Sequence, residues 1–210
     1  MNETTDLTRI IDCPLPLAEH SVDWKPENIA ATLQNLQQQS RGAEVVCLNR
    51  SFEVPRDTEP AIWPMCAAAA AIAPACLQLQ GRDVLGEHSL ICTPFPIDAG
   101  GCDCGIRVEV HEMGKRAVAI VTIDPLYFDY LRFDSIVAPP VGRGMQVFIR
   151  GSLPLPLAVS LVLSYAPCAE SVWIQERVRS GKNVCVYSKN PEELGCFASE
   201  QLTMIGEGQQ

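Results

Sequence analysis

The sequence predicts an α/β protein made of two tandem copies of one unit. Apolar runs of strand length alternate with longer apolar runs of helix length along the 210 residues. Both halves also repeat one order of elements: a strand (VVCL at 45–48, VFI at 147–149), a polar turn (NRS at 49–51, RGS at 150–152), a helix that ends at Ala-Pro, and two further strands. The first half has a longer loop after its turn, at residues 52–61, where insertions cost least. We therefore expect the halves to have a pseudo-twofold relation.

The composition indicates a compact protein without a membrane partner. Hydrophobic residues make up 47% of the sequence, enough for a sizeable core. No apolar run reaches the ~18 residues that cross a bilayer, and the polar N-terminus lacks the features of an export signal, so we expect a cytoplasmic protein. The formal net charge of −9 argues against binding of long DNA or RNA, which requires a surplus of lysine and arginine. A small nucleotide held by one or two arginines and backbone amides remains compatible with it.

Residues 1–97 hold the first copy of the unit. Pro26, followed by Ile29, Leu33 and Leu36 at helical spacing, predicts an amphipathic helix. An alanine-rich helix follows the 52–61 loop. The expected elements of this half are strands at 7–11, 44–48, 76–79 and 89–93, helices at 25–38 and 62–72, and a polar turn at 80–87.

A stretch rich in glycine and cysteine, residues 98–105, is predicted to link the halves. The second copy covers 106–200, and residues 201–210 form a tail. The alternating IRVEVH and the apolar AVAIVTI predict a hairpin that turns around 113–116. The expected elements of this half are strands at 106–111, 117–123, 145–149, 171–174 and 183–187, with helices at 124–133 and 153–165, the second begun by Pro154 and Pro156 and stopped by Pro167.

The two strand-to-helix turns are the strongest candidate site. In open α/β sheets, ligands bind beyond the carboxyl ends of the strands, and a helix N-terminus presents unpaired N–H groups to an anion. Asn49, Arg50 and Ser51 occupy the first turn, and residues 150–152 occupy the second. Two such turns that face each other would bind a phosphate-bearing ligand symmetrically. The alternative is a pair of ordinary connections with surface arginines.

Other chemistry has weaker support in the sequence. Of the ten cysteines, Cys47, Cys66, Cys92 and Cys185 stand in apolar runs, which predicts reduced, buried thiols. The Cys102-Asp103-Cys104 pair and His111 offer at most three zinc ligands, so no metal site is predicted. No nucleophile elbow, HExxH or P-loop occurs. Asp83, Glu87 and His88 form either an acid–base cluster or, as we favour, a polar turn.

The segment 145–188, with its R-G-S turn, the helix LPLPLAVSLVLSY and the two strands that follow, resembles the small CRISPR-associated ring nucleases, which bind cyclic tetra-adenylate and linearise it with manganese. The resemblance covers about 106–195 and only faintly the first half. Because members of that family are ferredoxin-like domains that assemble as dimers or larger oligomers, it implies two tandem ferredoxin-like units similar to a fused dimer. In the family pattern, a strand-end glycine and a helix-start proline match Gly151 and Pro154. Tyr165 and Arg177 match a tyrosine near the helix end and an arginine after the next strand.

The sequence departs from that family at the catalytic positions. Ala166 stands where the family has a histidine, and Gln175 stands where it has an aspartate; Ala73 and Arg82, near the equivalent places of the first half, replace neither. Without these groups there is no evident general base or metal carboxylate, although Glu176 could serve as an acidic group.

Three functions therefore remain open. The first is binding of a cyclic oligoadenylate messenger of CRISPR-linked antiviral signalling, without cleavage. The second is a divergent ring nuclease, a phosphodiesterase that would recruit Glu176, Asp83 or His88 and, by the resemblance, manganese. The third is a structural subunit whose apolar helices pack on a partner. The resemblance further implies a homo-oligomer. The expected phosphate contacts are Asn49, Arg50, Ser51, Arg150, Gly151, Ser152 and Arg177.

Overall fold

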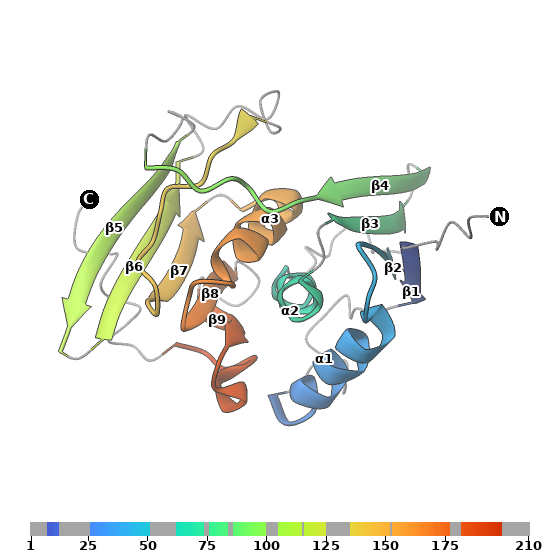
Figure 1. The fold of residues 1–210 in the computed structure, drawn as a ribbon, viewed down its shortest axis with the longest axis horizontal. Coiled ribbons are helices and arrows are strands. Elements are labelled where there is room, and N and C mark those ends of the chain that lie inside the picture. Colours follow the sequence, from blue (N-terminus) through green and yellow to red (C-terminus); the bar gives the residue numbers. More distant parts are fainter. Residues whose placement is uncertain are drawn as a thin grey trace.

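The chain folds into two β-sheets with helices packed between them (Figure 1). This architecture comes from a computed structural model, which describes residues 8–12, 26–50, 62–73, 76–83, 86–99, 105–114, 116–124, 135–151, 153–176 and 182–198. The first sheet contains β1 (Thr8–Asp12), β2 (Val45–Arg50), β3 (Cys76–Asp83) and β4 (Gly86–Cys92). The second contains β5 (Ile106–Met113), β6 (Arg116–Ile123), β7 (Gln146–Gly151), β8 (Ser171–Glu176) and β9 (Lys182–Ser188). The helices are α1 (Pro26–Ser40), α2 (Trp63–Ile72), α3 (Leu155–Tyr165) and the short 3-10 helix η4 (Pro191–Glu193).

The two sheets share one strand pattern. In the first sheet, β1, β2 and β3 are parallel neighbours and β4 pairs antiparallel with β3. In the second, β6, β7 and β8 are parallel neighbours and β9 pairs antiparallel with β8. The helix after the central strand, α2 in one half and α3 in the other, leads to the third parallel strand. The repeat seen in the sequence is therefore a repeat of topology, to which β5 adds one further strand in the second half.

The connectivity differs from the expected ferredoxin-like one. In a ferredoxin-like unit, an intervening strand splits each parallel βαβ pair. Here, strands that follow one another in the chain also lie side by side, so the described sheets have the orders β1-β2-β3-β4 and β5-β6-β7-β8-β9. The mixed α/β class with two sheets is confirmed, whereas the strand order is that of unsplit βαβ units.

One hydrophobic core extends through both halves. Helix α2 packs against α3 and against β9, and α3 also packs against β4, so each helix contacts the other half of the chain. Figure 1 shows α2 and α3 between the two sheets. The cluster of buried side chains runs without a break from Ile29 in α1 to Val186 in β9. The helices fit here because they are almost entirely apolar: residues 63–70 of α2 and 157–165 of α3 are all buried, and only Ser160 and Ser164 among them are polar residues, apart from the Tyr165 hydroxyl.

Most expected elements of the described segments are confirmed within a few residues. The main difference is the polar stretch 80–87, which we expected as a turn. Residues 80–83 instead complete β3, and residues 86–88 begin β4. Cross-strand pairing as far as Asp83 and Gly86 holds this polar sequence in strands despite its low strand propensity. The expected helix at 124–133 lies outside the described residues except for its first position.

The expected linker begins beside the second half. Ile97 forms a β-bridge with Ala138, and the Asp98 N–H donates to the Ala138 carbonyl at 3.2 Å. Residues 100–104, including Cys102 and Cys104, lie outside the described part of the chain. Among the described helices, none has the length and apolarity of a membrane span.

Candidate functional site

The site is built around Gly151, the last residue of β7. Its φ of +101° lies in the region that favours glycine, and a Cβ at this position would overlap the carbonyl oxygen of Ile123 on β6. The strand therefore passes β6 too closely for any other residue. Because α3 starts four residues later, Gly151 sets the path of the chain from the sheet to the helix.

Arg150 lies on the face of the sheet opposite α3. Val147 and Ile149 of β7 belong to the core that contains α3, whereas Phe148 belongs to a second cluster on the other face. The Arg150 guanidinium carbon lies 5.7 Å from the centroid of the Phe148 ring. Phe148 in turn stacks on Trp173, with 5.6 Å between centroids and 7° between planes. This stack holds the cation, which is 9% exposed, at the carboxyl end of β7.

Gln175 connects β8 to the glycine. The β7–β8 ladder ends with the pair of Ile149 and Ile174. Beyond it, the Gly151 N–H donates to the Gln175 side-chain oxygen at 3.1 Å. By the resemblance, Gln175 was expected to replace an aspartate, and in the structure its neutral amide positions the backbone of the turn. Thr122, opposite Arg150 on β6, is exposed and adds a hydroxyl at the same edge.

The other family-matched position of α3 lies away from this edge. Tyr165 is fully buried at the far end of the helix, and its hydroxyl donates to the Pro139 carbonyl at 2.9 Å. Because α3 has 11 residues, it separates Tyr165 from the turn by about 16 Å. Ala166, which was expected to replace a histidine, is also buried. The structure thus brings Gln175, but not Tyr165 or Ala166, to Gly151.

The predicted turns begin within strands. Asn49 and Arg50 are the last residues of β2; Asn49 pairs with β1 and β3, whereas Arg50 pairs with β3. Arg150 and Gly151 end β7 and pair with β6, beyond the end of the β7–β8 ladder. Ser51, Ser152 and Arg177 lie outside the described residues, as do the side chains of Asn49 and Arg50. Their predicted contacts with a ligand remain predictions.

The register of the first sheet adds His88 to this edge. Arg50 on β2 pairs with Gly81 on β3, and Gly81 pairs with His88 on β4, so the three residues form one row across neighbouring strands. Two strand spacings place the backbones of Arg50 and His88 about 10 Å apart. The backbone of His88, a candidate acid–base residue, thus lies level with that of Arg50, a predicted phosphate contact.

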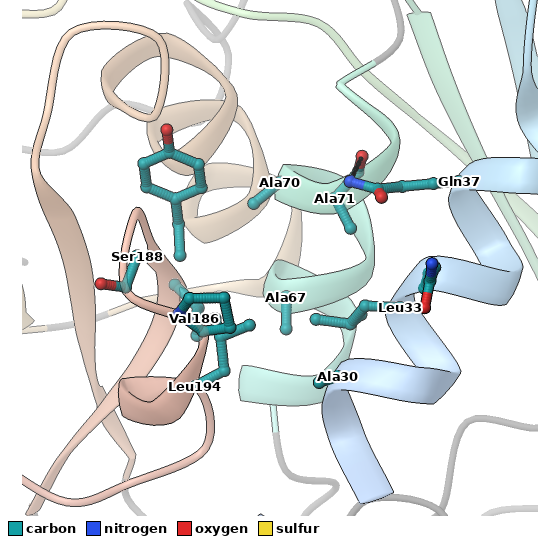
Figure 2. A pocket seen from close by; sticks show the side chains of 12 residues that line it. Ala30, Leu33, Gln37, Ala67, Ala70, Ala71, Val186, Ser188 and Leu194 are labelled. Carbon is teal, nitrogen blue, oxygen red and sulfur yellow. Dashed lines mark hydrogen bonds between the residues drawn. The ribbon is translucent and has the colours of Figure 1, made fainter.

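A cavity lies between the two halves (Figure 2). Its volume is about 440 Å³, and alanines of α1 and α2 face β9 and η4 across it. None of the lining residues is charged. They are Ala30, Leu33, Gln34, Gln37, Ala67, Ala70, Ala71, Val186, Tyr187, Ser188, Pro191 and Leu194.

The cavity and the Gly151 turn lie at opposite ends of β8. Ser188 and Tyr187, which line the cavity, pair with Ser171 and Val172 at the start of β8. Gln175 is near the end of that strand, about 13 Å further along. The cavity therefore does not belong to the strand-end site.

The described thiols and acidic groups form no metal centre. Cys47, Cys66, Cys92 and Cys185 are buried and unbridged, as predicted. Burial raises the pKa of the Cys92 thiol to about 12 and also raises the pKa values of Cys47 and Cys185, so these thiols stay protonated at neutral pH. His111 has the Glu109 carboxylate at 3.6 Å. Within the described segments, no three His, Cys, Asp or Glu residues form a metal-binding group.

Sequence reasoning missed the roles of Phe148, Trp173, Thr122 and Gln175. The alternation along β7 and β8 would have put Phe148 with Arg150, and Trp173 with Gln175, on single faces. The contact between the side chains of β7 and those of β8 depends on the pairing of Phe148 with Trp173. No sequence signal specifies this pairing. A comparison of the chain with models of known protein families and with curated proteins finds no match.

Proposed function

We propose that this protein binds a cyclic oligoadenylate at the carboxyl edges of its parallel strands and leaves the ring intact. The observation that carries the proposal is the Gly151 turn. A glycine that tolerates no Cβ, a largely buried arginine and a glutamine that orients the backbone meet where open α/β sheets bind ligands. Such an edge suits a phosphodiester, because a fixed guanidinium and backbone amides match its oxygens.

The repeated topology supports a ligand with internal symmetry. Each half has a central parallel strand that ends in an arginine-bearing segment, Asn49–Arg50 in β2 and Arg150–Gly151 in β7. A ring of identical nucleotides presents the same phosphate to each half. We propose that each chain binds one ring, with one half of the chain on each side of the ring. This stoichiometry agrees with the resemblance to ring nucleases and with the tandem duplication.

The missing catalytic groups support binding over cleavage. Ala166 is buried at the far end of α3, and Gln175 already accepts a hydrogen bond from the Gly151 N–H. Neither can act as a general base, and a neutral amide is a weak ligand for a divalent cation.

Calorimetric titration of the protein with cyclic tri-, tetra- and hexa-adenylate tests the proposal. We expect binding of one ring per chain at micromolar concentration. Arg150→Met, which keeps an apolar side chain over Phe148, should weaken binding more than tenfold, because a charge-assisted hydrogen bond contributes about 1.5–3 kcal/mol. Arg116→Met, at the opposite end of the sheet, is the control. A thermal unfolding curve confirms that each variant is folded, and the absence of heat with all three rings would contradict the proposal.

The second candidate function is cleavage of the same ring. It is favoured by the row Arg50, Gly81 and His88, because the strand register sets the backbone of a histidine level with that of a predicted phosphate contact, and a histidine can act as a general base. Incubation of labelled cyclic tetra-adenylate with manganese separates the two functions. Intact ligand is expected from the first proposal; linear product that disappears in His88→Ala would establish the second.

A further inference from the structure

Strand β5 is an edge strand with no counterpart in the first half. Its eight residues pair with β6 on one side, and none of the described residues pairs with its other side. In Figure 1 it forms the outer left border of the second sheet. Because the first sheet completes the same pattern without such a strand, β5 is an addition that the common unit does not require.

The outer edge of β5 lacks several of the features that prevent edge strands from pairing, although it carries charged side chains. Edge strands are normally blunted by charged side chains, lysine above all, by proline or by a bulge. The sequence of β5, IRVEVHEM, contains neither proline nor lysine, and its register with β6 is unbroken. Val110 is 54% exposed, among the most exposed large hydrophobic side chains described, and Arg107 and Glu109 are exposed beside it.

We propose that β5 pairs antiparallel with β5 of a second copy of this chain, in a register centred on Val108. Side chains opposite one another in a sheet must share a face. Only registers that pair odd-numbered residues with odd-numbered ones, and even with even, are therefore allowed. In the register centred on Val108, Arg107 lies opposite the partner's Glu109. Because the dimer has a twofold axis, this pair of opposite charges occurs twice. On the other face, Val108 meets the partner's Val108, and Ile106 meets the exposed Val110 of the partner subunit.

Neighbouring registers are less complementary. A register centred on Glu109 puts this carboxylate against the partner's Glu109, and one centred on Arg107 puts two guanidinium groups together. A register centred on Val110 opposes Val108 to the partner's Glu112, a charge against an apolar side chain. Glu109 also lies 3.6 Å from His111 of its own strand, so in the chosen register its carboxylate has a basic group on each side.

The proposed contact is small and therefore weak. Pairing over residues 105–111 buries less than the ~1,200 Å² of a stable interface, so the dimer should form in a concentration-dependent way. It extends the second sheet into one continuous ten-stranded sheet across two copies, because each sheet has five strands. The contact does not depend on the proposed ligand.

Sedimentation equilibrium of the full chain between about 10 µM and about 1 mM tests the proposal. The wild type should show a monomer–dimer equilibrium. Arg107→Glu and Glu109→Arg should each raise the dimer dissociation constant more than tenfold, because each places like charges together twice. The double variant Arg107→Glu/Glu109→Arg restores the opposite pairs and should restore the dimer.

Arg143→Glu is the matched control, since it changes the net charge as Arg107→Glu does at an exposed site away from β5. It should leave the dimer unchanged. Circular dichroism confirms the fold of each variant. A wild type that stays monomeric at the highest concentration would overturn the proposal. So would a dimer insensitive to the single exchanges, or a double variant that stays monomeric.

Discussion

Gly151 is the residue with the strictest local requirement at the candidate site. In Gly151→Ala, the new Cβ meets the Ile123 carbonyl oxygen at a φ of +101°, so β7 must move away from β6. We expect a loss of about 2–4 kcal/mol in the free energy of unfolding, measured by urea denaturation. Gly144→Ala is the control, because Gly144 has a φ of +72° but open space around it, and it should lose only about 1 kcal/mol. Equal losses in the two variants would mean that the close approach to β6 has no energetic consequence.

The buried Cys92 thiol should make the stability fall at alkaline pH. Its pKa rises from an ordinary 9.0 to about 12 in the folded protein, mainly through burial and secondly through Cys76. The unfolded chain therefore loses this proton first, and its contribution to stability is complete below pH 9 and disappears as the pH rises towards 12. The slope should approach 1.4 kcal/mol per pH unit for this group.

Urea unfolding of the wild type and of Cys92→Ala at pH 8, 9 and 10 measures this effect, with about 1.4 kcal/mol per unit as its upper bound. The difference between the two proteins isolates Cys92 from other titrating groups. A difference that stays constant between pH 9 and 10 would contradict the assignment.

Gln175 allows a test of charge at the proposed phosphate site. Gln175→Glu keeps an oxygen that accepts from the Gly151 N–H but adds a negative charge there. Binding of cyclic tetra-adenylate should weaken about tenfold through repulsion, while the unfolding free energy changes by less than about 1 kcal/mol. Gln37→Glu makes the same change of charge on α1, beside the distant cavity, and should leave affinity unaltered. Equal affinities of Gln175→Glu and the wild type would place the phosphate elsewhere.

At the level of single residues, the sequence indicates a turn at Arg150 and Gly151 but not the residues that contact them. A glycine shortly before a helix that begins with proline predicts a turn from the local sequence alone, without knowledge of the fold. The Phe148–Trp173 stack and the Gln175 hydrogen bond join residues about 25 positions apart, and they exist only because β7 and β8 pair in one register. That register is a property of the sheet.

Among the elements, α2 shows how an alanine-rich sequence can both pack tightly and leave space. Ala68 is fully buried away from the cavity, whereas Ala71 lines the cavity. In Ala71→Leu, the larger side chain should enter the cavity and raise the free energy of unfolding by about 0.5–1 kcal/mol. In Ala68→Leu, the same change should overpack the core and cost about 1–3 kcal/mol. Thermal and urea unfolding of both variants measure these effects, and stabilisation by Ala68→Leu would contradict the packing described for α2.

The elements found from the sequence are those with strong periodic patterns. The helix with Ile29, Leu33 and Leu36 on one face was predicted closely, as were the apolar strands of the second half. The polar residues 80–87 were predicted to form a turn because their composition is typical of turns, yet 80–83 belong to β3 and 86–87 to β4, paired in register. Strand propensity depends on the neighbouring strand, so a polar strand has little local signal.

At the scale of the whole molecule, the two predicted units share one core. The sequence indicated a boundary at 98–105 because glycines and cysteines gather there. However, Ile97 already pairs with Ala138, and α2 packs against α3 and β9. A boundary read from composition marks where the chain crosses between units and gives no information on whether the units pack together.

This shared core should make the protein unfold in one transition. Each half buries its central helix against the other, so loss of either half would expose the apolar surface of both α2 and α3. In differential scanning calorimetry, we expect a single peak whose calorimetric and van't Hoff enthalpies agree. Leu33→Ala in α1 and Leu161→Ala in α3 delete the same buried side chain in different halves. Each should lower the one Tm by about 5–15 °C, because a buried leucine contributes about 2–5 kcal/mol to the free energy of unfolding. Two resolved peaks, or a shift of only part of the transition in either variant, would show that the halves fold independently.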